Sequence, residues 1–283
     1  MTKIEFSKYH ALGNDFIIID LQKKRNQSFD FNSLARNICH RNFGVGADGI
    51  LVLTSSRKAD CCIDLFNSDG SWAEKSGNGL RVVAAYYFSH YTRKKNLLFE
   101  INNDFAGAKI IKSLRPSYSI KVSLGKPVFD TKLIPMKSKS KYCINEPVKI
   151  DGNDFPVTSL SVGNPHTVLF VDNFEFDWQE LGFIIENSKQ YPHRTNVEFV
   201  KIINRSKIIL NDWERGAGAT GSSGTGAAAA IVAGVVNGIL NRKAEVIFPG
   251  GSLFIDWSGS DDKIYLTGPV DLVCHGEYEY NPK

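Results

Sequence analysis

Long hydrophobic runs are absent from this chain. No apolar stretch approaches the roughly 20 residues that a membrane-spanning helix needs. The segment 1–6 begins a strand-like alternation instead of the apolar core of a signal peptide. The 283 residues are 42% apolar and 23% charged, as in an average soluble globular protein. These features predict a cytoplasmic chain with no membrane partner.

Paired cysteines and a strong charge of one sign are also lacking. The odd number of cysteines and the absence of a C-x-x-C motif argue against a disulfide framework and against a zinc site, so each cysteine is expected to be a small core residue. The cysteines are Cys39, Cys61, Cys62, Cys143 and Cys274. The net charge is only +4, and the basic clusters 93–95 and 132–141 have no interleaved aromatic residues. We expect solvated loops there and no nucleic-acid partner.

One short phrase occurs twice, as Ser76-Gly77-Asn78-Gly79 and as Ser223-Gly224-Thr225-Gly226, 147 residues apart. Each copy is followed by an alanine-rich apolar run. A serine, two alternating glycines and then good helix formers are typical of a capped helix N-terminus. The glycines leave unpaired backbone N–H groups open to a ligand, so each helix start is a modest anion site. We predict that both helix starts bind one small carboxylate through these N–H groups.

A second pair of motifs has nearly the same spacing. Gly13-Asn14-Asp15-Phe16 leads into an apolar run, and Gly163-Asn164-Pro165-His166 does the same 150 residues later. Similar offsets at two distinct motifs indicate two structurally related halves.

Short strand-like runs dominate the chain, and helical patterns are few. Helices are expected at 33–40 (with Ser33 or Asn32 as the cap), from 80 to about 91, at 178–188 and from 227 to about 240. The last of these is apolar around its whole circumference as far as Val236, so it must be buried on all sides. The sequence therefore predicts a mixed α and β fold of two pseudo-symmetric domains, each a mostly antiparallel curled sheet around a central helix.

The boundary between the halves is expected near Gly125-Lys126-Pro127, where the first copy of the repeat ends. We assign residues 1–124 and 270–283 to the N-terminal half and residues 125–269 to the C-terminal half.

Six motifs, in order and at matching spacing, give the chain a resemblance to a known family. They are Lys8-Tyr9-His10-Ala11-Leu12-Gly13-Asn14-Asp15-Phe16, Gly44-Val45-Gly46-Ala47-Asp48-Gly49, Phe66-Asn67-Ser68-Asp69-Gly70-Ser71, Ser161-Val162-Gly163-Asn164-Pro165-His166, Glu214-Arg215-Gly216-Ala217-Gly218 and Phe248-Pro249-Gly250-Gly251. The chain resembles the diaminopimelate epimerases, of the cofactor-independent amino-acid racemase superfamily, nearly from end to end. The resemblance implies an active site in a cleft between two similar domains, no cofactor, and a homodimer.

The same resemblance implies inversion of an α-carbon by two cysteines, one a thiolate base and the other a thiol acid, without pyridoxal phosphate or metal. Ser76 and Ser223 stand at the matching positions, so both sulfurs are absent. A thiol titrates near 8.5 and lower at a helix N-terminus, whereas a serine hydroxyl is far less acidic and needs an adjacent base. We expect both serines to cap helices and to transfer protons poorly. Natural divergence and deliberate replacement of both cysteines would give the same sequence.

The remaining motif positions keep the family's substrate frame. The resemblance implies that His166 and Glu214 lie near the two catalytic positions, and that Glu214 and Arg215 read the distal amino and carboxylate groups. It also implies hydrogen bonds to substrate from Asn14, Asn67, Asn164 and Asn196.

Without the resemblance these residues have ordinary interpretations. Asparagines suit turns, a Glu–Arg pair suits the surface, and His166 suits a satisfied core position as well as a proton relay.

Ala219 stands where the family usually has a glutamate, which puts the substrate in question.

The leading hypothesis is an isomerase that interconverts LL- and meso-2,6-diaminoheptanedioate for lysine and cell-wall synthesis by two-base proton transfer, impaired by the two serines. One alternative is a non-catalytic amino-acid-binding protein. Others are an isomerase or racemase of a different amino acid, and an enzyme that uses Glu214 or His166 as its single base. In every case the partner is a small amino acid.

Overall fold

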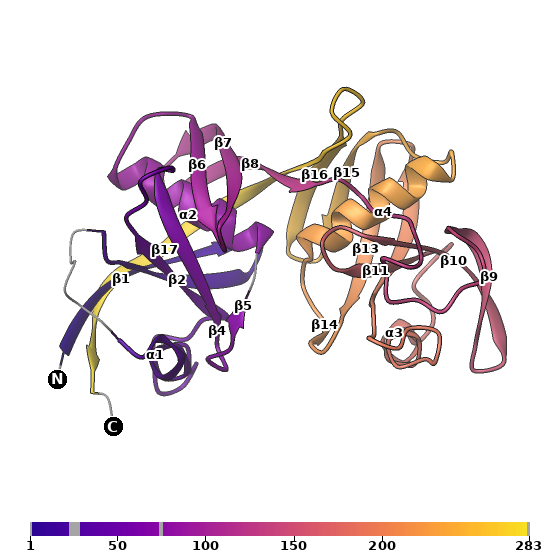
Figure 1. Ribbon diagram of the computed structural model, residues 1–283, viewed down its shortest axis with the longest axis horizontal. Coiled ribbons are helices and arrows are strands. Elements are labelled where there is room, and N and C mark those ends of the chain that lie inside the picture. The colour runs from indigo at the N-terminus through magenta and orange to yellow at the C-terminus, as the bar shows by residue number, and fades with distance from the viewer. Residues whose placement is uncertain (1, 23–28, 74–75, 282–283) are drawn as a thin grey trace. The chain divides into compact units, whose positions relative to one another are not determined.

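The computed structural model describes residues 2–22, 29–73 and 76–281. The chain divides into two compact units (Figure 1), unit 1 with residues 1–122 and 268–283 and unit 2 with residues 123–267. The sequence predicts each of these boundaries two residues later, at 124 and at 269. Within the described residues, no helix is both long enough and apolar enough to cross a membrane.

Unit 1 is a sheet with two helices. Its strands pair in the order β17–β1–β2–β3–β4–β6–β7–β8, with the short β5 beside β4. The elements are β1 (Thr2–Ala11), β2 (Asn14–Asp20), α1 (Phe31–Ile38), β3 (Gly49–Thr54), β4 (Cys61–Asn67), β5 (Trp72–Ala73), α2 (Gly77–His90), β6 (Asn96–Ile101), β7 (Asp104–Leu114), β8 (Ser117–Gly125) and β17 (Ile264–Tyr280).

Unit 2 repeats this plan. Its strands pair in the order β9–β10–β11–β12–β13–β15–β16, followed by the start of β17, with the short β14 beside β13. The elements are β9 (Cys143–Ile150), β10 (Asn153–Ser161), β11 (Pro165–Phe170), α3 (Trp178–Glu186), β12 (Asn196–Asn204), β13 (Lys207–Glu214), β14 (Gly218–Ala219), α4 (Gly224–Val236), β15 (Lys243–Phe248) and β16 (Gly251–Trp257).

The two units agree in strand direction as well as in order. In unit 1, β2 pairs with β3 and β4 with β6 in parallel, while the other pairs are antiparallel. In unit 2 the parallel pairs are β11 with β12 and β13 with β15. The predicted fold class, a mixed α and β structure with mostly antiparallel sheets, is confirmed.

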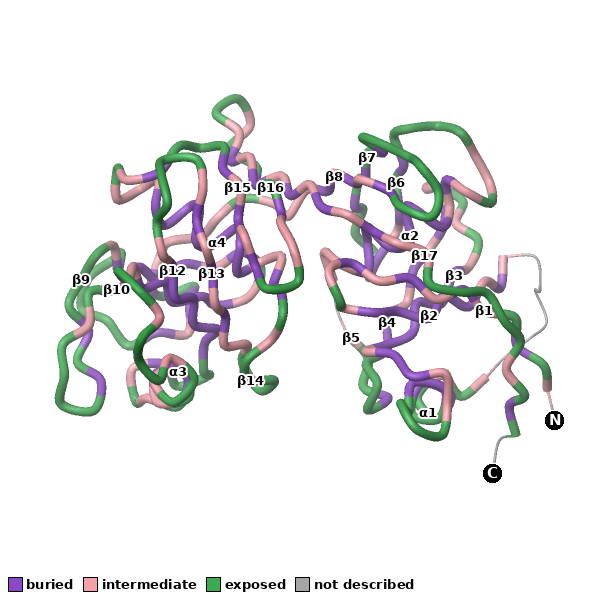
Figure 2. The backbone as a smooth tube through the Cα atoms, turned by 180° about the vertical axis from the view of Figure 1, so that it is seen from behind, coloured by how far each residue is buried: buried purple, intermediate pink, exposed green. Residues whose placement is uncertain are grey.

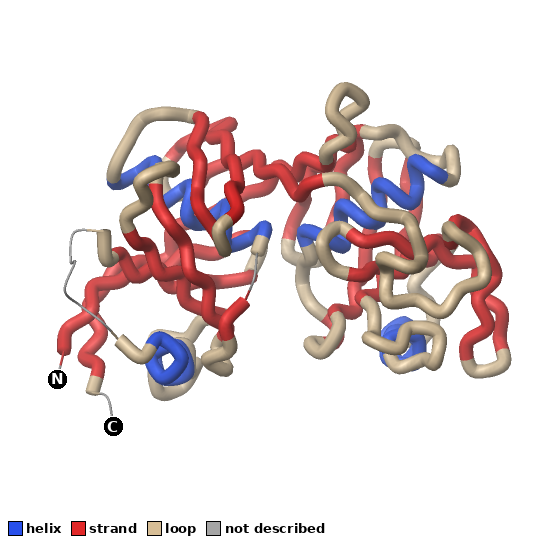
Figure 3. The backbone as a smooth tube through the Cα atoms, in the orientation of Figure 1, coloured by secondary structure: helices blue, strands red, loops and turns tan. Residues whose placement is uncertain are grey.

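Each unit has one central helix surrounded by strands (Figure 3). In unit 1, α2 contacts β1, β2 and β7, and in unit 2, α4 contacts β10, β11, β12, β13, β15 and β16. Residues 227–233 of α4 are fully buried, as the lack of a polar face requires. Buried residues concentrate along the strands around each central helix, and exposed residues lie in the connecting loops (Figure 2).

Two local predictions are wrong. The first helix begins at Phe31 instead of Ser33, because the Asp30 carboxylate accepts hydrogen bonds from the N–H groups of Asn32 and Ser33 and caps the helix earlier. Cys274 is exposed, since the stretch 273–277 of β17 lies in the open, whereas Cys39, Cys61 and Cys143 are buried as expected.

Candidate active site

The helix start in unit 1 is capped by Ser76. Its backbone is extended, and its Oγ accepts a hydrogen bond from the N–H of Gly79 at 3.0 Å. A side chain at Gly79 would place its Cβ 3.2 Å from Leu51 Cδ2, so glycine allows the strand below to pack closely. The predicted capping role of Ser76 is confirmed. The N–H groups of the first turn, which includes Gly77 and Asn78, have no partner within the helix.

A chain of side-chain amides links this helix start to β2. Asn14 donates to Asp48 Oδ2 at 2.7 Å and accepts from Asn78 Nδ2 at 2.9 Å. Asn78 in turn accepts from Arg81 Nη2 at 2.7 Å. The structure thus brings two of the predicted residues, Asn14 and Asn78, into contact.

Arg81 is a buried cation whose role the sequence does not reveal. It is fully buried in α2, and its Nε and Nη1 have no hydrogen-bond partner. Burial lowers its pKa to about 9. Its side-chain hydrogen bond to Asn78 Oδ1 fixes the orientation of the Asn78 amide.

Asn67 does not join this chain of amides. It is exposed at the end of β4 and donates to Ser71 Oγ at 2.9 Å, so its observed role is in the turn between β4 and β5.

The helix start in unit 2 is capped by Ser223, which is buried. Its Oγ accepts from the N–H of Gly226 at 3.1 Å, in the same geometry as Ser76. Glu198 Oε1 lies 3.1 Å from the position of a Cβ at residue 226. The carboxyl of Glu198 therefore lies close against the first turn of α4, where a Cβ at residue 226 would make a tight contact with it.

His166 and Glu198 form a fully buried pair on β11 and β12, with Nδ1 and Oε1 2.6 Å apart. The other ring nitrogen, Nε2, lies 2.9 Å from Asn164 Oδ1, and Asn164 Nδ2 donates to Thr225 Oγ1 at 3.4 Å. Both ring nitrogens thus face oxygen atoms. With Nε2–H donating to Asn164, a second proton lies between Nδ1 and Oε1, and the pair is neutral overall. His166 is thus buried, and both of its ring nitrogens are hydrogen-bonded to side chains.

Glu214 belongs to a second polar group in unit 2, in which Asp212 is buried and Glu214 and Thr220 are partly buried. Its Oε1 lies 2.7 Å from Thr220 Oγ1, and the same hydroxyl contacts Asp212 Oδ2. Burial raises the pKa of Glu198 and of Glu214. Burial, together with repulsion from these two residues, raises the pKa of Asp212 to about 7. We refer to Glu198, Asp212 and Glu214 as the acidic cluster.

Asn196 and Arg215 are linked through hydrogen bonds to the backbone beside Glu214. Asn196 donates to the Pro165 carbonyl at 2.6 Å and accepts from the N–H of Arg215 at 2.9 Å, which fixes the turn after Glu214. The Arg215 side chain is exposed and reaches the His193 carbonyl at 3.4 Å.

No buried thiol takes the place of the missing sulfurs. Burial raises the pKa of Cys39 to about 12 and shifts those of Cys61 and Cys143 in the same direction, so all three stay protonated at neutral pH. Across the described ranges, no group of three or more His, Cys, Asp or Glu side chains has an arrangement that could hold a metal ion.

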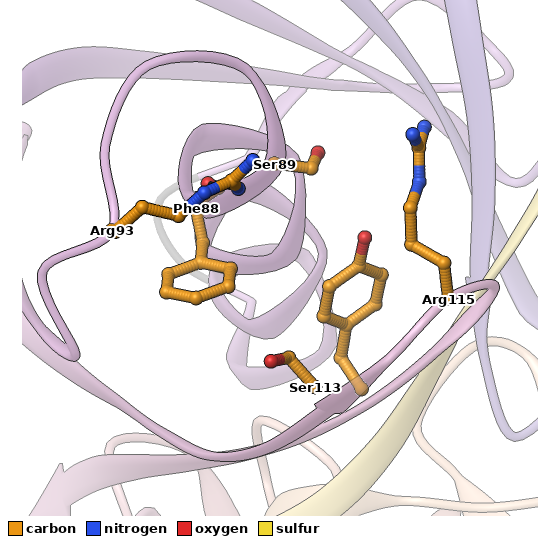
Figure 4. Close-up of a pocket in the computed structure, with 6 residues that line it drawn as sticks. Phe88, Ser89, Arg93, Ser113 and Arg115 are labelled. Carbon is orange, nitrogen blue, oxygen red and sulfur yellow. Dashed lines mark hydrogen bonds between the residues drawn. The ribbon is translucent and has the colours of Figure 1, made fainter.

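A cavity of about 220 Å³ in unit 1 is a separate feature (Figure 4). It is lined by Phe88, Ser89, Arg93, Ser113, Arg115 and Tyr118. Phe88 and Ser89 lie at the C-terminal end of α2, about 20 Å from Ser76 along a helix of 14 residues. None of the predicted site residues lines this cavity.

The fold is shared with a class of proteins that includes epimerases. A phenazine biosynthesis protein of the PhzF family from Bacillus anthracis superposes with a TM-score of 0.70 at 15% identity, covering 99% of this chain and 100% of that one. A predicted epimerase from Pseudomonas aeruginosa superposes with a TM-score of 0.67 at 12% identity, covering 98% and 100%.

Sequence comparison identifies the family within this class. The family model for diaminopimelate epimerase matches residues 6–129 and 158–273. A diaminopimelate epimerase from Carboxydothermus hydrogenoformans is 42% identical over 278 residues, which span 97% of this chain and 99% of that protein. The chain belongs to the diaminopimelate epimerase family and is an isomerase of that type.

Proposed function

We propose that the chain interconverts LL- and meso-2,6-diaminoheptanedioate by two-base proton transfer at one α-carbon, slowly because serine occupies both catalytic positions. The observation that carries this proposal is the pair of equivalent serine-capped helix starts in a chain 42% identical to a diaminopimelate epimerase.

Substrate binding is assigned to the two helix starts and the amides beside them. The N–H groups around Gly77 and Asn78, and those around Gly224 and Thr225, bind the α-carboxylate. Each helix end contributes about 0.3–1 kcal/mol to binding of an anion, and up to about 2 kcal/mol when partly buried. Asn14 and Asn164 orient these groups, since each is hydrogen-bonded to the first turn of the neighbouring helix.

The distal end of the substrate is assigned to Glu214 and Arg215. Asn67 and Asn196 are assigned hydrogen bonds to the substrate. The exposed guanidinium of Arg215 can bind a carboxylate bidentately. Both polar atoms of the Asn196 amide already bond the backbone, so it acts mainly by holding Arg215 in place.

Proton transfer is assigned to Ser76 and Ser223, assisted by His166 and Glu214. Removing an α-hydrogen requires a base and stabilisation of the carbanionic transition state. The helix starts supply the stabilisation. The serine hydroxyls supply the base poorly, because each is a weak acid and already accepts a hydrogen bond as a cap.

Solvent deuterium incorporation at the α-carbon tests the proposal. We expect slow exchange with the chain as it stands and exchange at least about 100-fold faster with Ser76→Cys plus Ser223→Cys, in the range that a positioned acid–base group contributes. Equal rates would show that the hydroxyls suffice. A cysteine form that is folded but inactive on diaminoheptanedioate would contradict the substrate assignment.

A second candidate is a non-catalytic binding protein for the same class of amino acid. The capping hydrogen bonds of both serines favour it, because they give Ser76 and Ser223 a structural role that needs no chemistry. Calorimetry separates the two: tight binding of one stereoisomer without exchange, in the cysteine form as well, would support the binding protein.

We further infer from the family that the protein acts in the cytoplasm as a homodimer. Light scattering on the purified chain should give about twice the 31.5 kDa of one copy. A monomeric mass would contradict the dimer.

A further inference from the structure

Thr220 lies between two carboxyl groups of the acidic cluster. Asp212 and Glu214 are two residues apart on β13, so their side chains leave the same face of the strand. Thr220 follows β14, which pairs antiparallel with β13, and this brings its hydroxyl to both side chains. Thr220 Oγ1 contacts Asp212 Oδ2 and lies 2.7 Å from Glu214 Oε1.

The number of protons at this hydroxyl is decisive. A threonine hydroxyl has one proton to donate, and an ionised carboxylate can only accept. If both carboxyls were ionised, one of the two oxygen–oxygen contacts would contain no proton and would be repulsive. One of the two carboxyls must therefore be protonated and donate to Thr220 Oγ1, while the threonine proton is donated to the other carboxyl.

The surroundings indicate which carboxyl holds the proton. Asp212 is 1% exposed, and its Oδ1 has no hydrogen-bond partner, whereas Glu214 is only partly buried. Across the strand pair Asp212 lies opposite Glu198, whose Oε2 is also without a partner. Ionising Asp212 would place an uncompensated negative charge beside the neutral His166–Glu198 pair, in a site shielded from water.

The basic groups near the cluster do not offset this charge. Among the described residues His166, on β11, is the basic side chain that acts on Glu198 and Glu214, and it is already paired with Glu198. Among the described residues, neither a lysine nor an arginine forms an ion pair with Asp212 or Glu214. The resting arrangement is therefore a neutral Asp212 and an ionised Glu214.

We propose that Asp212 is a positioning residue that shares one proton with Glu214 through the Thr220 hydroxyl. When Glu214 takes up a proton, the Asp212 O–H proton moves to Thr220 Oγ1 and the threonine proton moves to Glu214 Oε1. Asp212 is then ionised and Glu214 neutral, and the reverse shift restores the starting state. Two protons each move across one hydrogen bond, the net result is transfer of one proton from Asp212 to Glu214, no other reactant is needed, and the charge of the cluster stays constant. Any effect of this proton sharing on catalysis rests on the function proposed above, in which Glu214 assists proton transfer.

Carboxyl carbon NMR tests the proton sharing without reference to activity. With ¹³C-labelled Asp and Glu, titrated between about pH 4 and 9, we expect the Asp212 and Glu214 resonances to titrate in coupled steps. Thr220→Val removes the hydroxyl at nearly constant volume and should abolish the coupling, whereas Thr220→Ser should retain it. Asp212→Asn should leave Glu214 with one simple titration. Independent titration of both carboxyls in the unmodified chain, or unchanged coupling in Thr220→Val, would overturn the proposal.

The kinetic arm uses the Ser76→Cys plus Ser223→Cys protein, in which exchange is fast enough for a pH profile. We expect Thr220→Val and Asp212→Asn to lower kcat about 10-fold or more and to shift the pH dependence of kcat, with little change in KM. Thr220→Ser should retain the parent's kcat and its pH dependence. A pH profile of Asp212→Asn that superimposes on the parent's would overturn the positioning role. Failure of the cysteine protein to exchange any diaminoheptanedioate would reject the proposed function, and the NMR arm would still decide the proton sharing.

Discussion

Unit 1 and unit 2 place different side chains at equivalent points of the same strand pairing. Phe16 pairs with Gly49 in unit 1, and at the equivalent point of unit 2 His166 pairs with Asn196. Two residues further along, Leu51 lies opposite Leu65, where unit 2 has Glu198 opposite Asp212. The strand ends at Asn67 in unit 1 and at Glu214 in unit 2.

The difference separates what the shared scaffold does from what one copy adds. In both units the first turn of the serine-capped helix contains a glycine that a side chain of the neighbouring strand approaches closely. Leu51 approaches Gly79 in unit 1, and Glu198 approaches Gly226 in unit 2. The anion binding proposed for the helix start therefore belongs to the scaffold. The buried His166–Glu198 pair and the acidic cluster belong to unit 2, while unit 1 buries Arg81 and the ion-paired Asp15. We infer that the two serines work in unlike surroundings and have unlike roles in proton transfer.

The largest effect is expected from breaking the buried His166–Glu198 pair. Glu198→Leu, which installs the residue of unit 1, should lower the free energy of unfolding by about 2–3 kcal/mol because it leaves His166 Nδ1 buried without a partner. The double variant His166→Phe plus Glu198→Leu copies the apolar pair of unit 1 and should regain most of this loss. Urea unfolding followed by the fluorescence of Trp178 and Trp213 of unit 2 measures both.

The double variant is the control for this experiment. If it is as unstable as the single variant, a leucine at position 198 simply does not fit, and the equivalence of the two sites is wrong.

The next effect is expected from the titration of Asp212, which should make the stability of unit 2 depend on pH. Its pKa is about 7 in the folded protein, above the ordinary value of 3.8, so the folded state binds the proton more tightly than the unfolded state. This contribution is fully present below about pH 4 and is lost as the pH rises through 7. Asp212→Leu, which carries the residue of unit 1, should remove this pH-dependent loss of stability. Urea midpoints from about pH 4 to 8 measure the slope, and an unchanged slope in Asp212→Leu would assign it to other groups.

The smallest effect is expected at the caps. Ser76→Ala and Ser223→Ala should each lower the free energy of unfolding by about 1 kcal/mol, since each leaves a first-turn N–H without its partner. The buried Ser223 should show the larger loss, because water reaches its helix start less readily. Thermal unfolding of the two variants gives the comparison, and glycine at each site, which loses only a few tenths of a kcal/mol, is the matched control.

The sequence predicts what depends on local signals. The caps Ser76 and Ser223 follow from short-range helix chemistry, and the apolar circumference of 227–236 predicts its burial. Spacing between motifs predicts the two related halves. The cap of α1 is missed because Asp30, Asn32 and Ser33 compete for one role, and only the backbone decides among them.

The acidic cluster cannot be predicted in this way. Glu198, Asp212 and Thr220 come together through the register of β12, β13 and β14, which no local pattern encodes. Arg81 is hidden for a different reason, because an arginine in a helix is ordinarily a surface residue and only packing reveals its burial.

The most direct measurement compares α-deuterium exchange from the LL and the meso isomer in two single variants, Ser76→Cys and Ser223→Cys. If the helix starts act on opposite faces of one α-carbon, each restored thiol should accelerate exchange from a different isomer, so the two variants should have opposite isomer preferences. The same preference in both variants, or no acceleration in either, would contradict two-base transfer by these serine positions.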